Sequence, residues 1–407
     1  MVFSQWWRLP LILGRGLVWA MADDYEDDEV QDFGSRKKRG VIFTLVTLLL
    51  SIGVALPLAE FASRLIYTPQ VPTIPHPVYH HTRLANSTAR WTSSQGEFDT
   101  TVSFNSFALR GSEPDLGKEH LWLIMGDSLI EALQVPEEET ACRYLADRLG
   151  NGYTVMNAGV GGYSPVLSWL RLRALLEDLS PKVPEKVVLC MFPNDLEEEY
   201  IYRFTAYKDK KGDVLMVTPG LLRGPVGQLK AWAFRHSEIV QLLQKSFGNI
   251  GNERQTKVDP YYLSDNVLYP YRVVWTQKEK EVWAEMFRSI GDIKRLCDST
   301  GIDLAIAIIP AGHQIDGETW KTGKKEMYSN IETDYVEDST SFQDEIIKRS
   351  RRIDIPTIDL LPEFKEHPQP KDLYFDFDGH WTAEGNRFAA TVIERRLIEM
   401  EAKDENP

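Results

Sequence analysis

The chain has 407 residues, of which 43% are hydrophobic and 26% are charged, so it is long enough for one large or two ordinary globular domains and too apolar to be disordered. The formal net charge of −14 argues against extensive binding to nucleic-acid phosphates. The three cysteines (Cys142, Cys190 and Cys297) are scattered without CxxC or Cys/His spacing, which gives no sign of a disulfide framework or a zinc site.

The first 66 residues contain one segment of membrane-spanning length. A basic run, Arg36 to Arg39, precedes roughly nineteen uncharged and mostly apolar residues, Val41 to Ala59, which is about the length of a helix that crosses a bilayer. Basic residues next to a span stay in the cytoplasm. The pattern therefore predicts a cytoplasmic tail at 1–39, a transmembrane anchor in the lipid bilayer at 40–66, and a periplasmic or extracellular location for the rest.

Two alternatives stay open in this region. Residues 1–20 are apolar but interrupted by Arg8, Pro10 and Arg15, so they form either an interfacial amphipathic helix or a segment that precedes a natural start at residue 21. A cleaved signal peptide competes with the anchor. No small-residue cleavage site follows the apolar segment closely, and the tail before it is long, which favours the anchor.

Residues 67–118 are rich in Pro, Thr, Ser and His without a sustained period, which predicts a linker and a short approach to a domain at 119–402. In that domain the hydrophobic pattern alternates between buried strands and amphipathic helices. The strands are predicted at 121–125, 153–156, 187–192, 302–309 and 355–358, and the helices at 138–149, 165–179, 276–301, 342–352 and 383–400. Such alternation predicts an α/β fold with a parallel, doubly wound sheet and helices on both faces.

The alternation fails at about 196–275, which we interpret as an insertion near the mouth of the sheet. Residues 210–213 predict a hairpin turn, and residues 229–247 an amphipathic helix. The insertion contains many aromatic residues, namely Tyr200, Tyr202, Tyr207, Tyr261, Tyr262, Tyr269 and Tyr271. These side chains either stack against a sugar chain or pack the insertion against its host domain.

The stretch LWLIMGDS, from Leu121 to Ser128, places a serine directly after a buried strand. The strand stops at Gly126, and Asp127 and Ser128 follow at its carboxyl end. Ligands of open parallel sheets bind outside the carboxyl ends of the strands, so Ser128 is expected to face a cleft. The alternative is that Asp127 and Ser128 only cap the next helix.

Three further segments are expected at the same edge of the sheet. A glycine-rich loop, Asn157 to Gly162, follows the second strand; it lacks the GxGxxG spacing and the Gly-Lys-Ser/Thr ending of nucleotide sites, so a nucleotide is weakly supported. Asn194 and Asp195 follow the third strand, and Asp378-Gly379-His380 lies in a turn before the last helix. A nucleophilic serine needs a base, a carboxylate that orients the base, and donors for the oxyanion, and these segments supply all of them.

These four blocks, Gly126-Asp127-Ser128-Leu129, Asn157 to Gly162, Pro193-Asn194-Asp195 and Asp378-Gly379-His380, resemble the SGNH hydrolase superfamily, or GDSL esterases and lipases, over about residues 119–400. The resemblance implies a flavodoxin-like three-layer α/β/α domain that needs no cofactor or metal. It also implies roles for seven residues: Ser128 as nucleophile, His380 as base, Asp378 as its orienting carboxylate, the Ser128 and Gly162 N–H groups and the Asn194 side chain as oxyanion donors, and Asp127 and Asp195 as supporting groups.

The sequence departs from many family members in two places. Phe192 stands where many have glycine, and one residue rather than two separates Asp378 from His380. The Asp-x-His spacing resembles exported members such as alginate O-acetyltransferases, which move acetyl groups onto polysaccharides. We therefore expect an anchored serine hydrolase or acyltransferase for O-acyl esters of an envelope glycan, with partners in the membrane left open. The alternative is an inactive subunit that binds polysaccharide or scaffolds an assembly.

Overall fold

The computed structural model describes residues 27–66, 71, 73–219, 224–237, 239–240, 275–316 and 339–405. The chain divides into two units, Met1–Ala62 and Ser63–Pro407. Helix α1 (Asp27–Ile66) contains the stretch Val41–Ala62, which has a mean hydropathy of 2.5 and is not buried. By length and composition this helix could cross a membrane, and a signal sequence would meet the same criteria.

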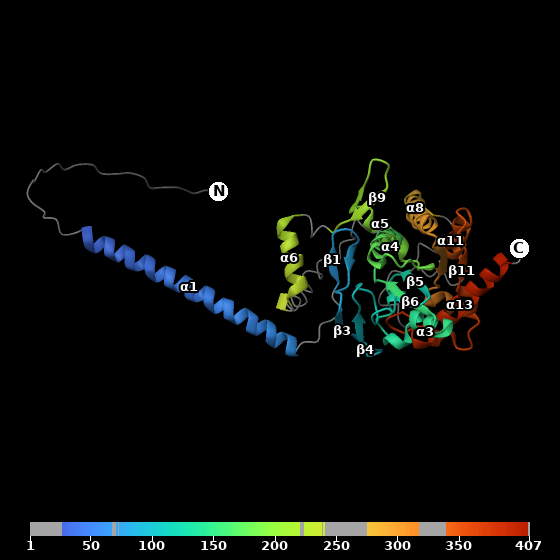
Figure 1. The fold of residues 1–407 in the computed structure, drawn as a ribbon, viewed down its shortest axis with the longest axis horizontal. Helices are drawn as coiled ribbons and strands as arrows, with labels where there is room; N and C mark the ends of the chain where they lie inside the picture. Colours follow the sequence, from blue (N-terminus) through green and yellow to red (C-terminus); the bar gives the residue numbers. More distant parts are fainter. Residues whose placement is uncertain are drawn as a thin grey trace, which may run out of the picture. The chain divides into compact units, whose positions relative to one another are not determined.

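A five-stranded parallel sheet forms the centre of the second unit (Figure 1). Its order is β11-β10-β7-β5-β6, with bounds β5 (His120–Gly126), β6 (Tyr153–Gly159), β7 (Lys186–Met191), β10 (Asp303–Ile308) and β11 (Thr357–Asp359). Numbered along the chain, this is the order 2-1-3-4-5 of flavodoxin-like sheets. The predicted fold class is therefore confirmed, and each of the five strands lies within a few residues of its predicted position.

The two faces of the sheet are covered by different helices, because side chains of successive strand residues point to opposite faces. On one face Leu123, Met125 and Leu189 pack with helices α4 (Pro165–Leu179), α8 (Gln277–Thr300) and α11 (Ser341–Arg351). On the other face Ile124 and Val188 pack with α3 (Ala141–Leu149) and α13 (Ala383–Glu405). The result is a three-layer α/β/α arrangement.

Helix ends follow the signals in the sequence. Thr276 and Glu279 form the capping box at the start of α8, and Gly301 ends this helix in the left-handed conformation with φ of 72°. Pro165 is the first residue of α4, where its missing N–H costs no hydrogen bond. Shorter elements complete the domain: α2 (Ser128–Glu131), η1 (Glu137–Glu139), α5 (Asp195–Tyr202), α9 (Gly312–Ile315), α12 (Leu361–Lys365) and η5 (Pro370–Leu373).

Residues 74–104 differ from the linker and approach segment that the sequence suggested, because they form two antiparallel hairpins. The first joins β1 (Ile74–His76) to β2 (His80–Thr82), and the second joins β3 (Ser87–Thr92) to β4 (Asp99–Phe104). Ala89, Val102 and Phe104 form a small buried cluster with Leu133. Strands of three to six residues, with few apolar positions among many polar ones, leave little periodicity in the sequence.

The inserted segment contains the predicted hairpin, β8 (Ala206–Lys208) and β9 (Val214–Val217). Helix α6 (Pro225–His236) begins before the predicted residue 229, and residues 241–247 of that prediction lie outside the described part of the chain. Tyr200 and Tyr202 are buried, which favours packing for these two, whereas Tyr207 is exposed. Tyr261, Tyr262, Tyr269 and Tyr271 also lie outside the described residues.

Candidate active site

The order of the strands places the ends of β5 and β7 at a crevice. The chain runs from β5 to β6 on one side and from β7 to β10 on the other, so the connections leave these two neighbouring strands in opposite directions. Ligands of doubly wound sheets bind at this point, outside the carboxyl ends of the strands. Ser128 follows β5 and Asn194 follows β7, so both residues lie where such a ligand would bind.

Ser128 is the first residue of the short helix α2, after a tight turn. A side chain on Gly126 would place its Cβ 2.8 Å from the side chain of Ile130 and 3.1 Å from the backbone oxygen of Cys190, so the turn requires glycine. Asp127 caps the helix, since its carboxylate accepts a hydrogen bond of 3.0 Å from the Leu129 N–H. The capping interpretation thus holds for Asp127, and it leaves the Ser128 hydroxyl available.

The structure brings Ser128, His380 and Asp378 into one hydrogen-bonded chain. His380 Nε2 lies 2.8 Å from Ser128 Oγ, and His380 Nδ1 lies 2.6 Å from Asp378 Oδ1. A carboxylate can only accept, so Nδ1 carries a proton and Nε2 of the neutral ring keeps its lone pair for the serine hydroxyl. The side chains of His380 and Asp378 are 26% and 22% exposed, so solvent and ligands can reach the pair.

The Asp-x-His spacing is accommodated by a turn that a distant hairpin holds. The Gly379 N–H donates to the Phe375 carbonyl at 3.1 Å, and Gly379 has a φ of 78°. Glu97, between β3 and β4, accepts from the N–H groups of Phe377 at 2.8 Å and Asp378 at 2.9 Å. The hairpin thus fixes the backbone that carries Asp378 and His380.

Two of the three expected oxyanion donors are free, and the third is engaged. Within the described chain we find no hydrogen bond from the N–H of Ser128 or of Gly162, which has a φ of 80°. Asn194 Nδ2 instead lies 3.1 Å from Asp127 Oδ2 and 3.2 Å from Glu198 Oε1. The Asn194 amide is therefore held by two carboxyl groups.

Three acidic side chains lie beside Ser128 and Asn194. Asp127 and Asp195 are 1% and 2% exposed, and Glu198 is partly buried. Asp195 accepts a hydrogen bond of 2.7 Å from the Phe192 N–H, which fixes the turn before Asn194. Burial raises the pKa of all three carboxyls, and repulsion from Asp127 raises the pKa of Asp195 and Glu198 further.

Residues 264–406 match a protein-family model described as the SGNH hydrolase-like domain, acetyltransferase AlgX. Over this segment the chain resembles SGNH hydrolase-like domains of the AlgX acetyltransferase type. The matched segment of this SGNH domain includes Asp378 and His380, whereas Ser128, Gly162 and Asn194 precede it. The predicted resemblance is confirmed, and the roles of the individual residues remain predictions.

Solved structures with low sequence identity also resemble the chain. The carbohydrate acetylesterase Est24 from Sinorhizobium meliloti has a TM-score of 0.36 and 14% identity, and the match covers 69% of this chain and 100% of Est24. The psychrotrophic esterase EstA from Pseudoalteromonas sp. has a TM-score of 0.37 and 13% identity, with coverage of 70% and 100%. No curated protein sequence matches the chain.

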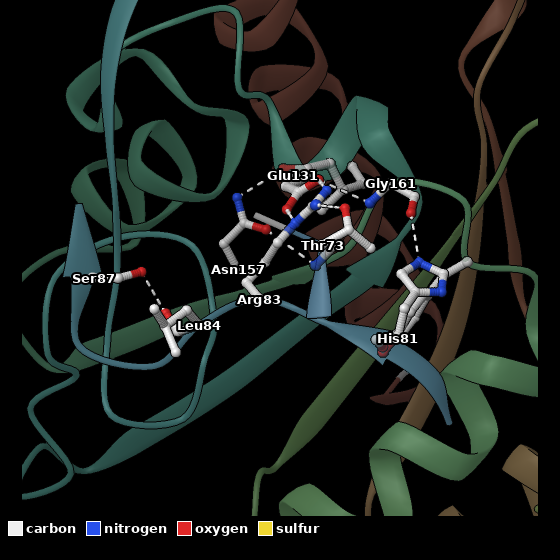
Figure 2. A network of polar contacts seen from close by, with 11 residues as sticks. Thr73, His81, Arg83, Leu84, Ser87, Glu131, Asn157 and Gly161 are labelled. Atoms are coloured by element: carbon white, nitrogen blue, oxygen red, sulfur yellow. Dashed lines mark hydrogen bonds and ion pairs between the residues drawn. The ribbon is translucent and has the colours of Figure 1, made fainter. Parts of the chain in front are cut away.

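Sequence reasoning missed a polar network beside the glycine-rich loop of the SGNH domain (Figure 2). Arg83 pairs with Glu131 through two hydrogen bonds of 2.5 and 2.6 Å, and both side chains are buried. Glu131 also accepts from the Gly161 N–H at 2.8 Å, and His81 Nε2 lies 2.9 Å from the Gly161 carbonyl oxygen. The signal in the sequence was weak, because Arg83 and His81 lie in a segment without a clear period.

Glu198 was also missed, although its spacing could have identified it. It lies four residues after Asn194, at the start of α5, and residues four apart face each other on a helix. For metals, the described residues contain no group of three or more His, Cys, Asp or Glu side chains arranged to hold an ion.

Proposed function

We propose that this chain is a membrane-anchored serine hydrolase or acyltransferase that acts on O-acyl esters, with acetyl esters of an envelope polysaccharide as the first class to test. The observation that carries the proposal is the chain of hydrogen bonds from Ser128 through His380 to Asp378, with distances of 2.8 and 2.6 Å. The acetyltransferase description of the matching family directs the proposal to acetyl groups. The Asp-x-His spacing, which resembles that of alginate O-acetyltransferases, directs it to polysaccharides.

In this mechanism Ser128 Oγ attacks the ester carbonyl carbon while its proton passes to His380 Nε2. Asp378 accepts the Nδ1–H bond and stabilises the imidazolium that forms. The carbonyl oxygen becomes an oxyanion that accepts hydrogen bonds from the free N–H groups of Ser128 and Gly162. His380 then returns the proton to the leaving alcohol, which leaves an acyl group on Ser128. Water or a sugar hydroxyl removes that group, with His380 again as the base.

Asn194 has a conditional part in this mechanism. Its amide hydrogens point to Asp127 and Glu198, so it donates to the oxyanion only when one of these bonds lengthens or is shared. Removal of one oxyanion donor typically raises the barrier by about 2.7 to 4 kcal/mol. Asp127 supports the site by accepting a hydrogen bond from the Asn194 amide, and Asp195 supports it by holding the turn before Asn194.

We also propose an arrangement for the whole chain. Residues 1–39 form a cytoplasmic tail, 40–66 an anchor in the lipid bilayer, 67–118 the connection whose hairpins pack on the domain, and 119–402 the SGNH domain with its insertion at 196–275. The domain then lies in the periplasm or outside the cell, where it meets carbohydrate esters and other membrane proteins. Fusion of a periplasm-dependent alkaline phosphatase reporter after residue 66 tests this topology; an inactive fusion would contradict it.

The decisive experiment compares Ser128→Ala with wild type in the hydrolysis of p-nitrophenyl acetate by the full-length protein in detergent. We expect the activity to fall to background, because no nucleophile remains. The exposed serine variant Ser299→Ala controls for loss of a hydroxyl elsewhere. Equal rates for wild type and Ser128→Ala would remove Ser128 from the mechanism. Mass spectrometry of surface glycans with and without the protein then identifies the acceptor.

A further inference from the structure

The loop from Val160 to Tyr163 has almost every backbone polar group engaged. The Gly161 N–H donates to Glu131, and the Gly161 carbonyl faces His81 Nε2 at 2.9 Å (Figure 2). The Gly162 carbonyl accepts from the Tyr202 hydroxyl at 2.7 Å. The Tyr163 N–H closes the turn by donating to the Val160 carbonyl at 3.0 Å. The Gly162 N–H has no acceptor in the described part of the chain.

The Gly161 carbonyl and the Gly162 N–H belong to the same peptide group. A trans peptide is planar, and its C=O and N–H point in opposite directions. The hydrogen bond to His81 therefore sets the direction of the Gly162 N–H, which points away from His81. The Ser128 side chain borders this loop, since a Cβ on Gly161 would lie 3.5 Å from the Cβ of Ser128.

Without such a bond this peptide would be easy to turn over. Both flanking residues are glycines, which rotate freely in conformations that other residues avoid. A flipped peptide would present the Gly161 carbonyl where the N–H now lies, and a carbonyl oxygen repels an oxyanion. The loop therefore needs an external contact that selects one orientation.

The protonation state of His81 follows from its two partners. A carbonyl oxygen only accepts, so His81 Nε2 carries the proton, and Nδ1 of the neutral ring is an acceptor. The Nδ1 atoms of His80 and His81 lie 3.0 Å apart, so His80 donates to His81. His80 has a φ of 62°, in the left-handed region that non-glycine residues rarely adopt. The surrounding structure thus holds His80 in a conformation that aims it at His81.

The position of His81 is also fixed by packing. Its side chain is buried, its ring lies edge-on to that of Tyr163 with centroids 5.1 Å apart, and its backbone carbonyl accepts from the Tyr163 hydroxyl at 2.7 Å. The charged groups around it are Arg83, which directly follows β2, and Glu131 on α2.

We propose that His81 is a positioning residue, which holds the Gly161–Gly162 peptide so that the Gly162 N–H is presented to the oxyanion formed at Ser128, with His80 selecting the required tautomer of His81. The inference rests on the proposed function, because it assigns His81 to the acyl-transfer site. It goes beyond that function because His81 lies on the N-terminal hairpin and not on the α/β sheet.

The test uses two amide substitutions of His81 in the full-length protein. In His81→Gln the amide nitrogen of the new side chain is separated from Cα by the same number of bonds as Nε2 of histidine. It can therefore still donate a hydrogen bond to the Gly161 carbonyl. In His81→Asn the amide nitrogen is separated from Cα by the same number of bonds as Nδ1 of histidine. It is too short to reach the Gly161 carbonyl, so the hydrogen bond to Gly161 is lost. For p-nitrophenyl acetate hydrolysis we expect His81→Asn to lower kcat by at least about tenfold. The upper limit is the roughly 10²–10³-fold fall in kcat that follows complete removal of one oxyanion donor. KM should change by less than about twofold, and His81→Gln should retain most of kcat.

Two further measurements separate positioning from simple support of the fold. Tyr202→Phe removes a hydrogen bond to the neighbouring carbonyl of the same loop and should leave kcat close to wild type. Inhibition by 1,1,1-trifluoroacetone, which forms an oxyanion on the serine, should weaken in His81→Asn by the same factor as kcat/KM. Nitrogen NMR of histidine-labelled wild type should report the Nε2–H tautomer for His81, a measurement that does not depend on any variant folding.

Each outcome decides one claim. Equal kcat values for His81→Gln and His81→Asn, or an Nδ1–H tautomer for His81, would overturn the positioning role while Ser128-dependent activity upholds the proposed function. Wild-type activity in Ser128→Ala would overturn the proposed function and this inference with it. A fall of kcat in His81→Asn alone, matched by the loss of trifluoroacetone inhibition, supports both.

Discussion

The carboxyl edge of the parallel sheet and the N-terminal hairpins contribute to the same site in different ways. The sheet edge carries the groups assigned to the chemistry: Ser128 after β5, Gly162 after β6 and Asn194 after β7. The segment 74–104 carries none of these groups, but its side chains contact the backbone around them. His81 contacts the glycine-rich loop, Arg83 pairs with Glu131 on α2, and Glu97 holds the turn that carries Asp378. Under the proposed function, the sheet edge supplies the nucleophile and the oxyanion donors, and the hairpins hold the backbone around them and the turn that carries His380.

The largest effect is expected on the catalytic side of this comparison. Asp378→Asn should lower kcat by about 10⁴-fold, or about 5.5 kcal/mol, because an amide at this position favours the wrong tautomer of His380. Steady-state kinetics with p-nitrophenyl acetate measures the loss. Asp376→Asn, two residues earlier in the same turn, is the matched control and should keep wild-type kcat. A small loss in Asp378→Asn would separate Asp378 from the mechanism.

The next effect concerns the buried pair that joins the first hairpin to α2. Arg83→Met should lower the free energy of unfolding by about 3–5 kcal/mol, because it leaves the Glu131 carboxylate buried with its ion partner removed. Chemical denaturation of the full-length protein in detergent measures this change. The double variant Arg83→Met/Glu131→Gln should be less destabilised than Arg83→Met alone. If the two variants lose the same stability, the cost does not come from the unpaired charge.

A smaller effect is expected where the second hairpin meets the catalytic turn. Glu97→Ala removes the acceptor of two N–H groups that precede His380, so the turn loosens and kcat should fall by about tenfold, which corresponds to about 1.4 kcal/mol. Glu113→Ala is the control, since Glu113 likewise accepts from the backbone and side chain of Ser106 but does not contact this turn. Similar kcat values for both variants would argue against a role of the hairpin in the site.

The same two regions also differ in what the sequence could reveal. Continuous apolar runs such as Leu121–Met125 predicted the parallel sheet, and the position of Ser128 and Asn194 after such runs predicted their meeting at one edge. The hairpins lack this signal, because their strands are short and mostly polar and their apolar residues face a cluster of only a few side chains. Their contacts with Gly161 and Asp378 join residues far apart in the chain, which no local pattern encodes.

The engagement of Asn194 by Asp127 and Glu198 was hidden for a different reason. The sequence places an amide at the sheet edge, but the direction of its hydrogens depends on which carboxyl groups the fold brings within 3.2 Å. The four-residue spacing from Asn194 to Glu198 was readable, whereas the approach of Asp127 from the neighbouring strand depends on the register of β5 and β7.

The smallest expected effect is a pH dependence on the catalytic side. Burial, together with the charges of Asp127 and Glu197, raises the pKa of Glu198 well above its usual value. The folded state therefore retains a proton that the unfolded chain releases near pH 4.3, so stability that Glu198 contributes below this pH is lost as the pH rises towards its folded pKa. Glu198→Gln cannot lose a proton, and its free energy of unfolding should fall less between pH 5 and 8 than that of wild type. Exposed Glu366→Gln controls for the change in net charge. Parallel pH profiles for wild type and Glu198→Gln would show that Glu198 ionises in the folded site as it does in water.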